Sequence, residues 1–410
     1  MTTKPKGPLN GIIVIDLTRI LSGPHCTRIL SDLGARVIKI EPPSGDPTRS
    51  FSSHIPSPYK KEVSSSYFAA VNSGKETITL DLKTSHYDRN ILKKLIRKAD
   101  VLVENFRPGV MKRLGFDWHA VHQVNSKCVM CSISGFGQTG PDSALGAVDT
   151  IIQATSGMMS VTSTQANGPP TRSGVSVSDI LAGVYAANGI QAALLARERN
   201  INGTGAYVDI SMLDCSVAAS LIPLGQWYAT GKNPLPIGNR NPVVSPFDNF
   251  KCKMDTRLVI ACMKQKDFVK LCELINKKDL IHMTKYKNNN SRVKNSLELS
   301  NEIEIGLSSK TANEWLVLLR QNNITCAPVN APSDVFQSEQ VQSRNMGLLS
   351  KDKRFVIAGN PLKISGYCDM TVRDNPPLLN ESEKSIIQFA NEEQEESTGR
   401  TRKSTLKSKL

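Results

Sequence analysis

The stretch GIIVIDLTRILSGPHCTRILSDLGARVIKIE, residues 11–41, decides the fold class. Its first seven residues form an apolar run that is typical of a buried parallel strand, and residues 35–41 form a second such run. Between them, Pro24 favours the start of a helix and Gly34 favours its end. The stretch therefore predicts a compact βαβ unit.

Strands and helices continue to alternate along the first half of the chain. Residues 76–82, 100–106, 127–133 and 207–213 have strand patterns, while residues 85–99 and 179–197 have helical ones. Such alternation predicts an α/β fold with an open, mainly parallel sheet.

A change of composition predicts where this large domain is interrupted. Residues 231–247 are rich in Pro, Gly and Asn, which is typical of a boundary. After it we expect a small α+β domain, and then a return through the strand-like segments RFVIAG (354–359) and LKISG (362–366). The predicted organisation is a large domain over 1–230 and 334–388, a small domain over 231–333 and a polar tail over 389–410.

The glycines of SISGFGQTGP, residues 132–141, match the dinucleotide pattern G-x-G-x-x-G. That pattern binds a pyrophosphate only where it opens a helix, and Pro141 is followed by no helical repeat. We therefore expect a tight turn at a strand end, in which glycine supplies a positive φ, and not an NAD site.

The composition excludes several function classes. The chain of 410 residues has a net charge of +14, but only 5% of its residues are aromatic and no basic stripe interleaves with aromatics, which disfavours nucleic acid as a partner. No apolar run is long enough to span a membrane. The nine cysteines and six histidines show no metal-ligand spacing, so we expect reduced, mostly buried thiols and no metal.

The chain ends in Ser408-Lys409-Leu410 after a polar, charged approach. A terminal S-K-L is the address that the peroxisomal import receptor reads. The chain enters a strand soon after Met1, which leaves no room for a signal or transit peptide. We expect a peroxisomal location; the cytoplasm and the mitochondrion are the alternatives.

Asp179 is the candidate for chemistry, because it opens the long helix of small residues. Ser176-x-x-Asp179 resembles a capping box, in which the helix dipole would hold the carboxylate ionised for use as a nucleophile or base. The alternative is that Asp179 is only a cap. Nearby, Arg172 offers a fork for a substrate carboxylate or a surface ion pair, and Asp149 is a second acid.

Several long motifs, in order, resemble the CaiB/BaiF family, the class III CoA-transferases. They are PLNGIIVIDLTRILSGP, SDLGARVIKIEPPSGDPTR, DVLVENFRPGVMKRLGF, SISGFGQTGP, VSDILAG and CAPVN. The likeness runs from residue 8 to about 388, and within the family it is greatest to succinyl-CoA:glutarate or hydroxymethylglutarate CoA-transferases. It implies a Rossmann-like large domain, a small domain and an interlocked, ring-like homodimer.

The resemblance also implies a mechanism and a set of site residues. Asp179 matches the family's catalytic aspartate, which forms a mixed anhydride and then an aspartyl-CoA thioester while CoA passes from succinyl-CoA or another acyl-CoA to an acid such as glutarate. No metal or permanent cofactor is implied, and CoA enters as a substrate. The contacts to CoA carry over onto Ile20, Ser22, Leu80, Leu82, Lys83, Asn105 and Arg113.

Three departures from the family pattern keep alternatives open. Pro42 stands where an arginine is frequent, and VIACMKQKDF (259–268) lacks the glycines that shield the anhydride in some transferases. Val148 stands where the family's 2-methylacyl-CoA racemases carry a proton-transferring histidine, which disfavours racemisation. A racemase-like enzyme and a non-catalytic acyl-CoA binder are the alternatives to a CoA-transferase.

Overall fold

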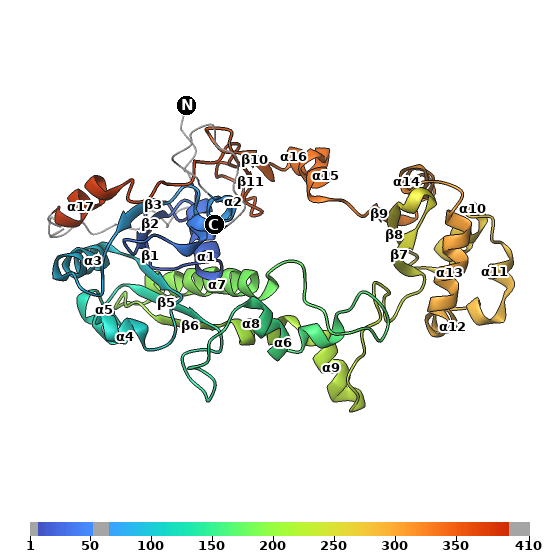
Figure 1. Cartoon of the computed structure of the whole chain (residues 1–410), viewed down its shortest axis with the longest axis horizontal. Coiled ribbons are helices and arrows are strands. Elements are labelled where there is room, and N and C mark those ends of the chain that lie inside the picture. The colour runs from blue at the N-terminus through green and yellow to red at the C-terminus, as the bar shows by residue number, and fades with distance from the viewer. Residues whose placement is uncertain (1–6, 52–64, 393–410) are drawn as a thin grey trace, which may run out of the picture.

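Figure 1 shows the chain as a computed structural model that describes residues 7–51 and 65–392. Within these residues lies a six-stranded sheet of order β3-β2-β1-β4-β5-β6, in which every pair of neighbours is parallel. Its strands are β1 (Ile13–Asp16), β2 (Arg36–Glu41), β3 (Glu76–Thr79), β4 (Val101–Glu104), β5 (Val129–Ser134) and β6 (Tyr207–Ser211). The predicted open parallel sheet is confirmed, and its strand order reverses between β1 and β4.

Helices cover both faces of this sheet, and each face has its own core. Successive strand residues point to opposite faces, so Ile15 and Leu102 lie in one core while Val14 and Val101 lie in the other. The first face is covered by α3 (His86–Lys98), α4 (Val110–Leu114), α5 (Trp118–Val124) and α17 (Glu383–Asn391). The second is covered by α1 (Ser22–Asp32), α6 (Asp149–Thr155), α7 (Val177–Arg199) and α8 (Met212–Ala219).

The backbones of α1 and α7 approach each other closely at Gly183. A Cβ atom at this position would lie 2.7 Å from the carbonyl oxygen of Ser22 and 2.9 Å from the His25 ring. Only glycine leaves room for this approach. The contact brings the amino end of α1 beside the first turn of α7.

A second unit is built around an antiparallel sheet of order β7-β8-β9. Its strands are β7 (Phe247–Lys251), β8 (Arg257–Ala261) and β9 (Thr325–Pro328). Its helices are α10 (Gln265–Leu274), α11 (Asp279–His282), α12 (Asn289–Lys294), α13 (Ser296–Leu307) and α14 (Ala312–Gln321). Phe250, Leu271 and Trp315 belong to its separate core.

The chain then returns to the large sheet through α15 (Pro332–Gln337), α16 (Glu339–Ser343), β10 (Gly347–Leu349) and β11 (Val356–Ala358). Arg373 forms an ion pair with Asp32 of α1, which attaches this returning segment to the large unit. The predicted strand over 362–366 is wrong. Leu362 and Ile364 are about half exposed, and the described residues offer this segment no neighbouring strand.

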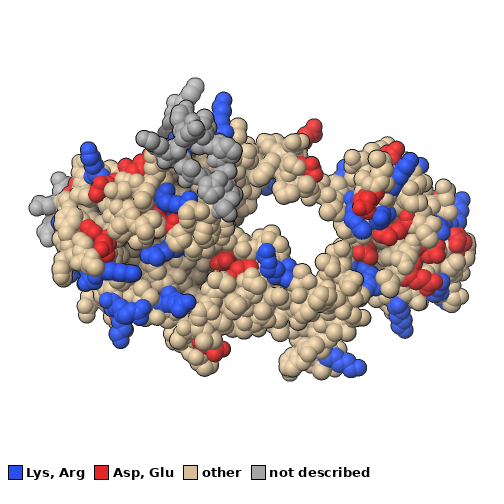
Figure 2. Space-filling model, viewed as in Figure 1, with Lys and Arg blue, Asp and Glu red and all other residues tan. Residues whose placement is uncertain are grey.

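The two units are joined by two separate connections, so one chain has the shape of an open ring. One connection runs through α9 (Leu221–Thr230) and residues 231–246, and the other through α15 and α16 (Figure 1). Figure 2 shows the opening between them, and shows Lys and Arg interspersed with Asp and Glu on the visible face of the small unit. The expected ring-like subunit is therefore present.

By length and composition, α7 is the one helix in the described residues that could cross a membrane. It packs against α1 and the large sheet, as a core helix does, and no membrane span is evident.

Candidate active site

The turn between β1 and α1 is strained. Ile20 has a φ of +68°, and a β-branched residue rarely adopts this left-handed conformation. Asn105, which follows β4, binds the backbone of Arg19, the residue before Ile20. Asn105 Oδ1 accepts from the Arg19 N–H at 2.8 Å, and Asn105 Nδ2 donates to the Arg19 carbonyl at 2.8 Å. Asn105 therefore fixes the backbone that leads into Ile20 and Ser22.

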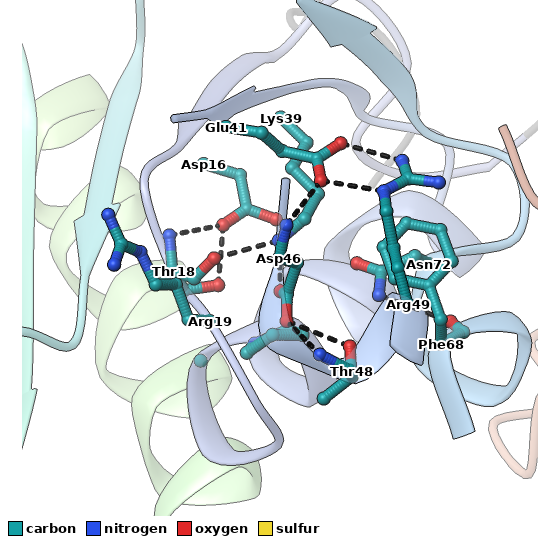
Figure 3. A network of polar contacts seen from close by, with 12 residues as sticks. Asp16, Thr18, Arg19, Lys39, Glu41, Asp46, Thr48, Arg49, Phe68 and Asn72 are labelled. Atoms are coloured by element: carbon teal, nitrogen blue, oxygen red, sulfur yellow. Dashed lines mark hydrogen bonds and ion pairs between the residues drawn. The ribbon is translucent and has the colours of Figure 1, made fainter. Parts of the chain in front are cut away.

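A buried network of ion pairs and hydrogen bonds holds this turn in place (Figure 3). Asp16 Oδ1 accepts from the Thr18 N–H at 2.8 Å, and Lys39 Nζ donates to the Thr18 carbonyl at 2.7 Å. Lys75 Nζ lies 2.9 Å from Asp16 Oδ2 and also donates to Thr27 of α1. The network ties the end of β1, the first turns of α1 and the segment before β3 into one rigid support.

Asp16 is the anion at the centre of this network. Burial alone would raise its pKa, but Lys75, Lys39 and hydrogen bonds from Thr18 and Thr27 outweigh burial and lower the pKa to about 2. Its charge is therefore permanent at physiological pH, and its two oxygens are occupied.

Asp179 lies in the first turn of α7, half-buried, against the amino end of α1. Burial and then the nearby charge of Asp149 raise its pKa to about 6, while hydrogen bonds from the Ser22 hydroxyl and backbone N–H oppose the rise. Because helix N-termini carry partial positive charge, the convergence of α1 and α7 favours negative charge at this point. The group is a reactive carboxylate that is mostly ionised at neutral pH.

The expected capping box at Ser176 is absent: the Ser176 side chain makes no cap hydrogen bond. Instead Asp149 of α6 caps α7, because its Oδ1 accepts from the Ser178 N–H at 2.9 Å. Gln153 holds the other Asp149 oxygen at 2.6 Å. Because α6 supplies the cap of α7, the Asp179 carboxylate does not cap its own helix and contacts Ser22 instead. The helix dipole is expected to favour the ionised carboxylate, but burial and Asp149 outweigh the groups that favour its charge, so the pKa of Asp179 is raised while the carboxylate stays mostly ionised at neutral pH.

Tyr67 of α2 (Ser66–Asn72) is a candidate site residue that no sequence pattern indicated. Burial and then the charge of Asp179 raise the pKa of its hydroxyl. Its ring packs edge-on against Phe51 with the ring centroids 5.5 Å apart. The fold thus brings a hydroxyl donor to the neighbourhood of Asp179 from a distant part of the chain.

The structure gathers some of the predicted CoA contacts at this place and leaves others apart. Ile20 is 37% exposed beside the turn, and Ser22 and Asn105 join it, with Asn105 Nδ2 3.4 Å from Ser22 Oγ. The side chains of Leu80 and Leu82 are buried in the core of the α3 face. Those of Lys83, Arg113 and Arg172 are exposed, and within the described part of the chain the Arg172 side chain donates to the carbonyl of its neighbour Ser173.

The glycine-rich stretch after β5 forms the expected turn. Gly137 and Gly140 have φ values of +88° and +92°, and irregular chain leads from there to α6. No helix opens on the glycines, so the geometry required for a dinucleotide is missing. Within residues 7–51 and 65–392, His, Cys, Asp and Glu form no group of three that could hold a metal ion.

Comparison with known proteins identifies the family. The model of CoA-transferase family III matches residues 9–383. The chain belongs to CoA-transferase family III. It is 44% identical to an acetyl-CoA:oxalate CoA-transferase of Acetobacter aceti, over 92% of this chain and 94% of the relative. It is 33% identical to the succinyl-CoA:glutarate CoA-transferase of Mus musculus, over 93% and 86% of the two chains.

A solved structure agrees with this assignment. A CaiB/BaiF family protein from Brucella suis superposes with a TM-score of 0.87 at 31% identity, over 94% of this chain and all of that one. The protein is therefore a CoA-transferase enzyme, which uses CoA thioesters as substrates and holds no permanent cofactor. Identity is higher to the acetyl-CoA:oxalate transferase than to the succinyl-CoA:glutarate transferase.

Proposed function

We propose that this CoA-transferase moves CoA from an acyl-CoA to a short dicarboxylic acid through a covalent intermediate on Asp179. The observation that carries the proposal is the position of Asp179, where two helix N-termini and two Ser22 donors converge on an unpaired carboxylate. A nucleophile needs such a free oxygen, and an oxyanion needs such donors. The family assignment supports the same reaction class.

The reaction exchanges acyl groups between oxygen and sulfur. An Asp179 oxygen attacks the thioester carbonyl, the C–S bond breaks, and a mixed anhydride and CoA thiolate remain. The thiolate then attacks the aspartyl carbonyl, which releases the donor acid and leaves an aspartyl-CoA thioester. The acceptor carboxylate attacks this thioester, and the expelled thiolate attacks the acceptor carbonyl of the new anhydride. The products are the acceptor's CoA thioester and free Asp179.

The electrostatics of the site suit both halves of this exchange. A carboxylate with a pKa of about 6 is ionised at pH 7, yet it is more basic than an ordinary aspartate and therefore a better nucleophile. The amino ends of α1 and α7 favour the oxyanions that form during each attack.

The acids exchanged are proposed from the relatives and from Arg172. Oxalate and glutarate, named for two relatives, are both dicarboxylic acids. The exposed Arg172 guanidinium, on the loop before α7, supports this choice as a fork that would bind the second carboxylate of such an acid. We propose oxalate or glutarate as acceptor, with acetyl-CoA or succinyl-CoA as donor.

A matrix assay tests this function. The purified enzyme is mixed with each pair of acetyl-CoA or succinyl-CoA with oxalate, glutarate or the monocarboxylate butyrate, and products are separated by chromatography. Transfer to a dicarboxylate at a rate at least about ten times that to butyrate is expected, and Arg172→Met should remove this preference. Absence of all transfer, with α-proton exchange of a 2-methylacyl-CoA in D₂O, would instead show the racemase alternative.

We also propose that two copies interlock into a homodimer. In α9 no residue is buried, and Leu221, Ile222 and Tyr228 are 73%, 80% and 86% exposed. An apolar helix exposed to this extent marks an interaction surface, and the open ring of Figure 2 leaves space for a second chain. Light scattering should give twice the mass of one chain, and replacing Leu221, Ile222 and Tyr228 by Ser should give single chains.

We propose, finally, that the protein is imported into peroxisomes. The supporting signal, Ser408-Lys409-Leu410, lies outside the described residues. A fluorescent protein fused to the amino end should enter peroxisomes, and deletion of the last three residues should leave it in the cytoplasm. Mitochondrial or cytoplasmic fluorescence of the full-length fusion would contradict the proposal.

A further inference from the structure

Arg19 stands out as a half-buried cation without a partner. Its backbone is fixed by Asn105, but no hydrogen bond or ion pair reaches its guanidinium from the residues that the structure describes. Figure 3 shows the guanidinium turned away from the ionic network, and it stacks over the Phe106 ring at 5.0 Å from the centroid. Burial lowers the pKa of Arg19, and the charges of Asp46 and Glu41 offset only part of this effect.

The carboxylates around Arg19 already have partners of their own. The ion pairs of the network are Asp16 with Lys75, Asp46 with Lys39 and Glu41 with Arg49. Arg19 is therefore left without an ion pair of its own among the described residues, although the charges of Asp46 and Glu41 partly offset its burial. A half-buried guanidinium of this kind favours the binding of an anion.

The place of Arg19 in the fold indicates where that anion comes from. Arg19 follows β1 at the carboxyl edge of the sheet, where the strand order reverses between β1 and β4. Ligands of open α/β sheets bind in the crevice at this point. Asn105 links the Arg19 backbone to Ser22, which in turn contacts Asp179, so Arg19 belongs to the turn that carries the proposed reaction site. Pro42, which follows β2 at the same edge of the sheet, offers a ligand neither a charge nor an N–H donor.

We infer that Arg19 binds an oxyanion of the substrates, with a planar fork that phosphate and carboxylate oxygens both fit. The inference rests on the proposed CoA-transfer function. The oxyanion is either a phosphate of CoA or the second carboxylate of the acid. Arg19 acts as a substrate anchor and takes no part in bond making.

Two variants and two readouts test this inference. Arg19→Met keeps the apolar stem over Phe106 and removes the charge, while Arg19→Lys keeps the charge and removes the fork. Titration calorimetry measures the Kd of CoA, 3′-dephospho-CoA and pantetheine, and steady-state assays measure the KM of oxalate and glutarate. Arg97→Met, an exposed arginine at the opposite edge of the sheet, is the matched control.

Arg19→Met should weaken the binding of one ligand class by about 10–100-fold, seen as a raised Kd or KM. Arg19→Lys should recover only part of this loss of binding. A raised Kd for CoA with an unchanged Kd for pantetheine identifies a phosphate of CoA as the ligand. If the Kd for 3′-dephospho-CoA is also unchanged, the ligand is the 3′-phosphate. A raised KM for the acids alone identifies the carboxylate. Unchanged values in both arms would overturn the inference. Calorimetry needs no turnover, so failure of the proposed reaction would be seen separately, as wild-type binding without transfer.

Discussion

Asp16 and Asp179 lie at the two ends of the same short turn and have opposite electrostatics. Asp16, at the end of β1, is surrounded by Lys75 and Lys39, and its pKa is lowered to about 2. Asp179 meets the turn at Ser22 and has an acidic neighbour in place of a cation, and its pKa is raised to about 6. Burial pushes both pKa values upward, so the partners decide the outcome.

The difference explains why one aspartate holds the site and the other can react. Every Asp16 oxygen is occupied by a buried donor, which makes the carboxylate a fixed part of the framework. Among the described residues, the hydrogen bonds that act on Asp179 come from Ser22 alone, and no cation pairs with its carboxylate. The first should govern stability and the second activity, and five predictions test that division.

The largest effect is expected on catalysis. Asp179→Asn should lower kcat/KM for CoA transfer by at least about 10³-fold, because the neutral amide cannot attack the thioester. Transfer by the variant above one per cent of the wild-type rate would contradict the assignment.

The same variant should not lose stability. The raised pKa means that the folded state is favoured below about pH 4, and that this advantage is lost as pH rises through 6. Asp179→Asn removes the charge, so at pH 8 its unfolding free energy should equal or exceed that of the wild type by about 1–3 kcal/mol. Urea titrations at pH 8 and pH 4 check this, since the difference should vanish at pH 4.

Asp16→Asn should show the opposite behaviour. Removal of the anion leaves Lys75 buried without its counter-charge, which should lower the unfolding free energy by about 3–5 kcal/mol. The wild type should keep this stabilisation above about pH 4 and lose it as pH falls toward 2, because the pKa of Asp16 is depressed. Urea unfolding measures the effect, and a variant as stable as the wild type would show that the network is not a support.

A smaller effect is expected where the two helices touch. A Cβ at position 183 would meet the carbonyl of Ser22, so Gly183→Ala should displace α1 from α7 and lower kcat by about 10²-fold. Gly189→Ala on the same helix is the control, since its Cβ would meet side chains of β6, Val208 at 2.9 Å and Ile210 at 4.0 Å, and no backbone of α1. Equal losses in both variants would show a general defect of α7 and not a displaced Ser22.

The smallest effect concerns pH. The kcat/KM should rise as Asp179 ionises and level off above an apparent pKa of about 6. Ser22→Ala removes a hydrogen bond that favours the charged form, so its profile should shift to higher pH and its rate at pH 5.5 should fall several-fold. A Ser22→Ala profile at or below the wild-type midpoint would exclude the proposed contact.

The sequence predicted the framework well because its signals are local. Apolar runs at 11–17 and 100–106 became β1 and β4, and helical periodicity over 179–197 became α7. The glycines at 137 and 140 adopt positive φ as expected. The predicted strand at 362–366 failed because strand formation needs a neighbour that local pattern does not reveal.

The electrostatics of the site could not be predicted in the same way. The partner of Asp16 is 59 residues away, and the cap of α7 comes from Asp149, 29 residues before Ser178. Ser176-x-x-Asp179 has capping-box spacing, but the Asp179 carboxylate accepts hydrogen bonds from Ser22 of α1 instead. No local sequence motif indicates this contact between two helices. Contacts between distant elements therefore set the pKa values that separate the two aspartates.

The covalent role of Asp179 is tested most directly by trapping the intermediate. The enzyme is mixed with acetyl-CoA or succinyl-CoA without acceptor, quenched in hydroxylamine, digested and analysed by mass spectrometry. Hydroxylamine converts an aspartyl thioester or anhydride into a hydroxamate, so we predict this modification on Asp179 and its absence in Asp179→Asn. An unmodified Asp179 in enzyme that completes CoA transfer in the same buffer would contradict the covalent mechanism.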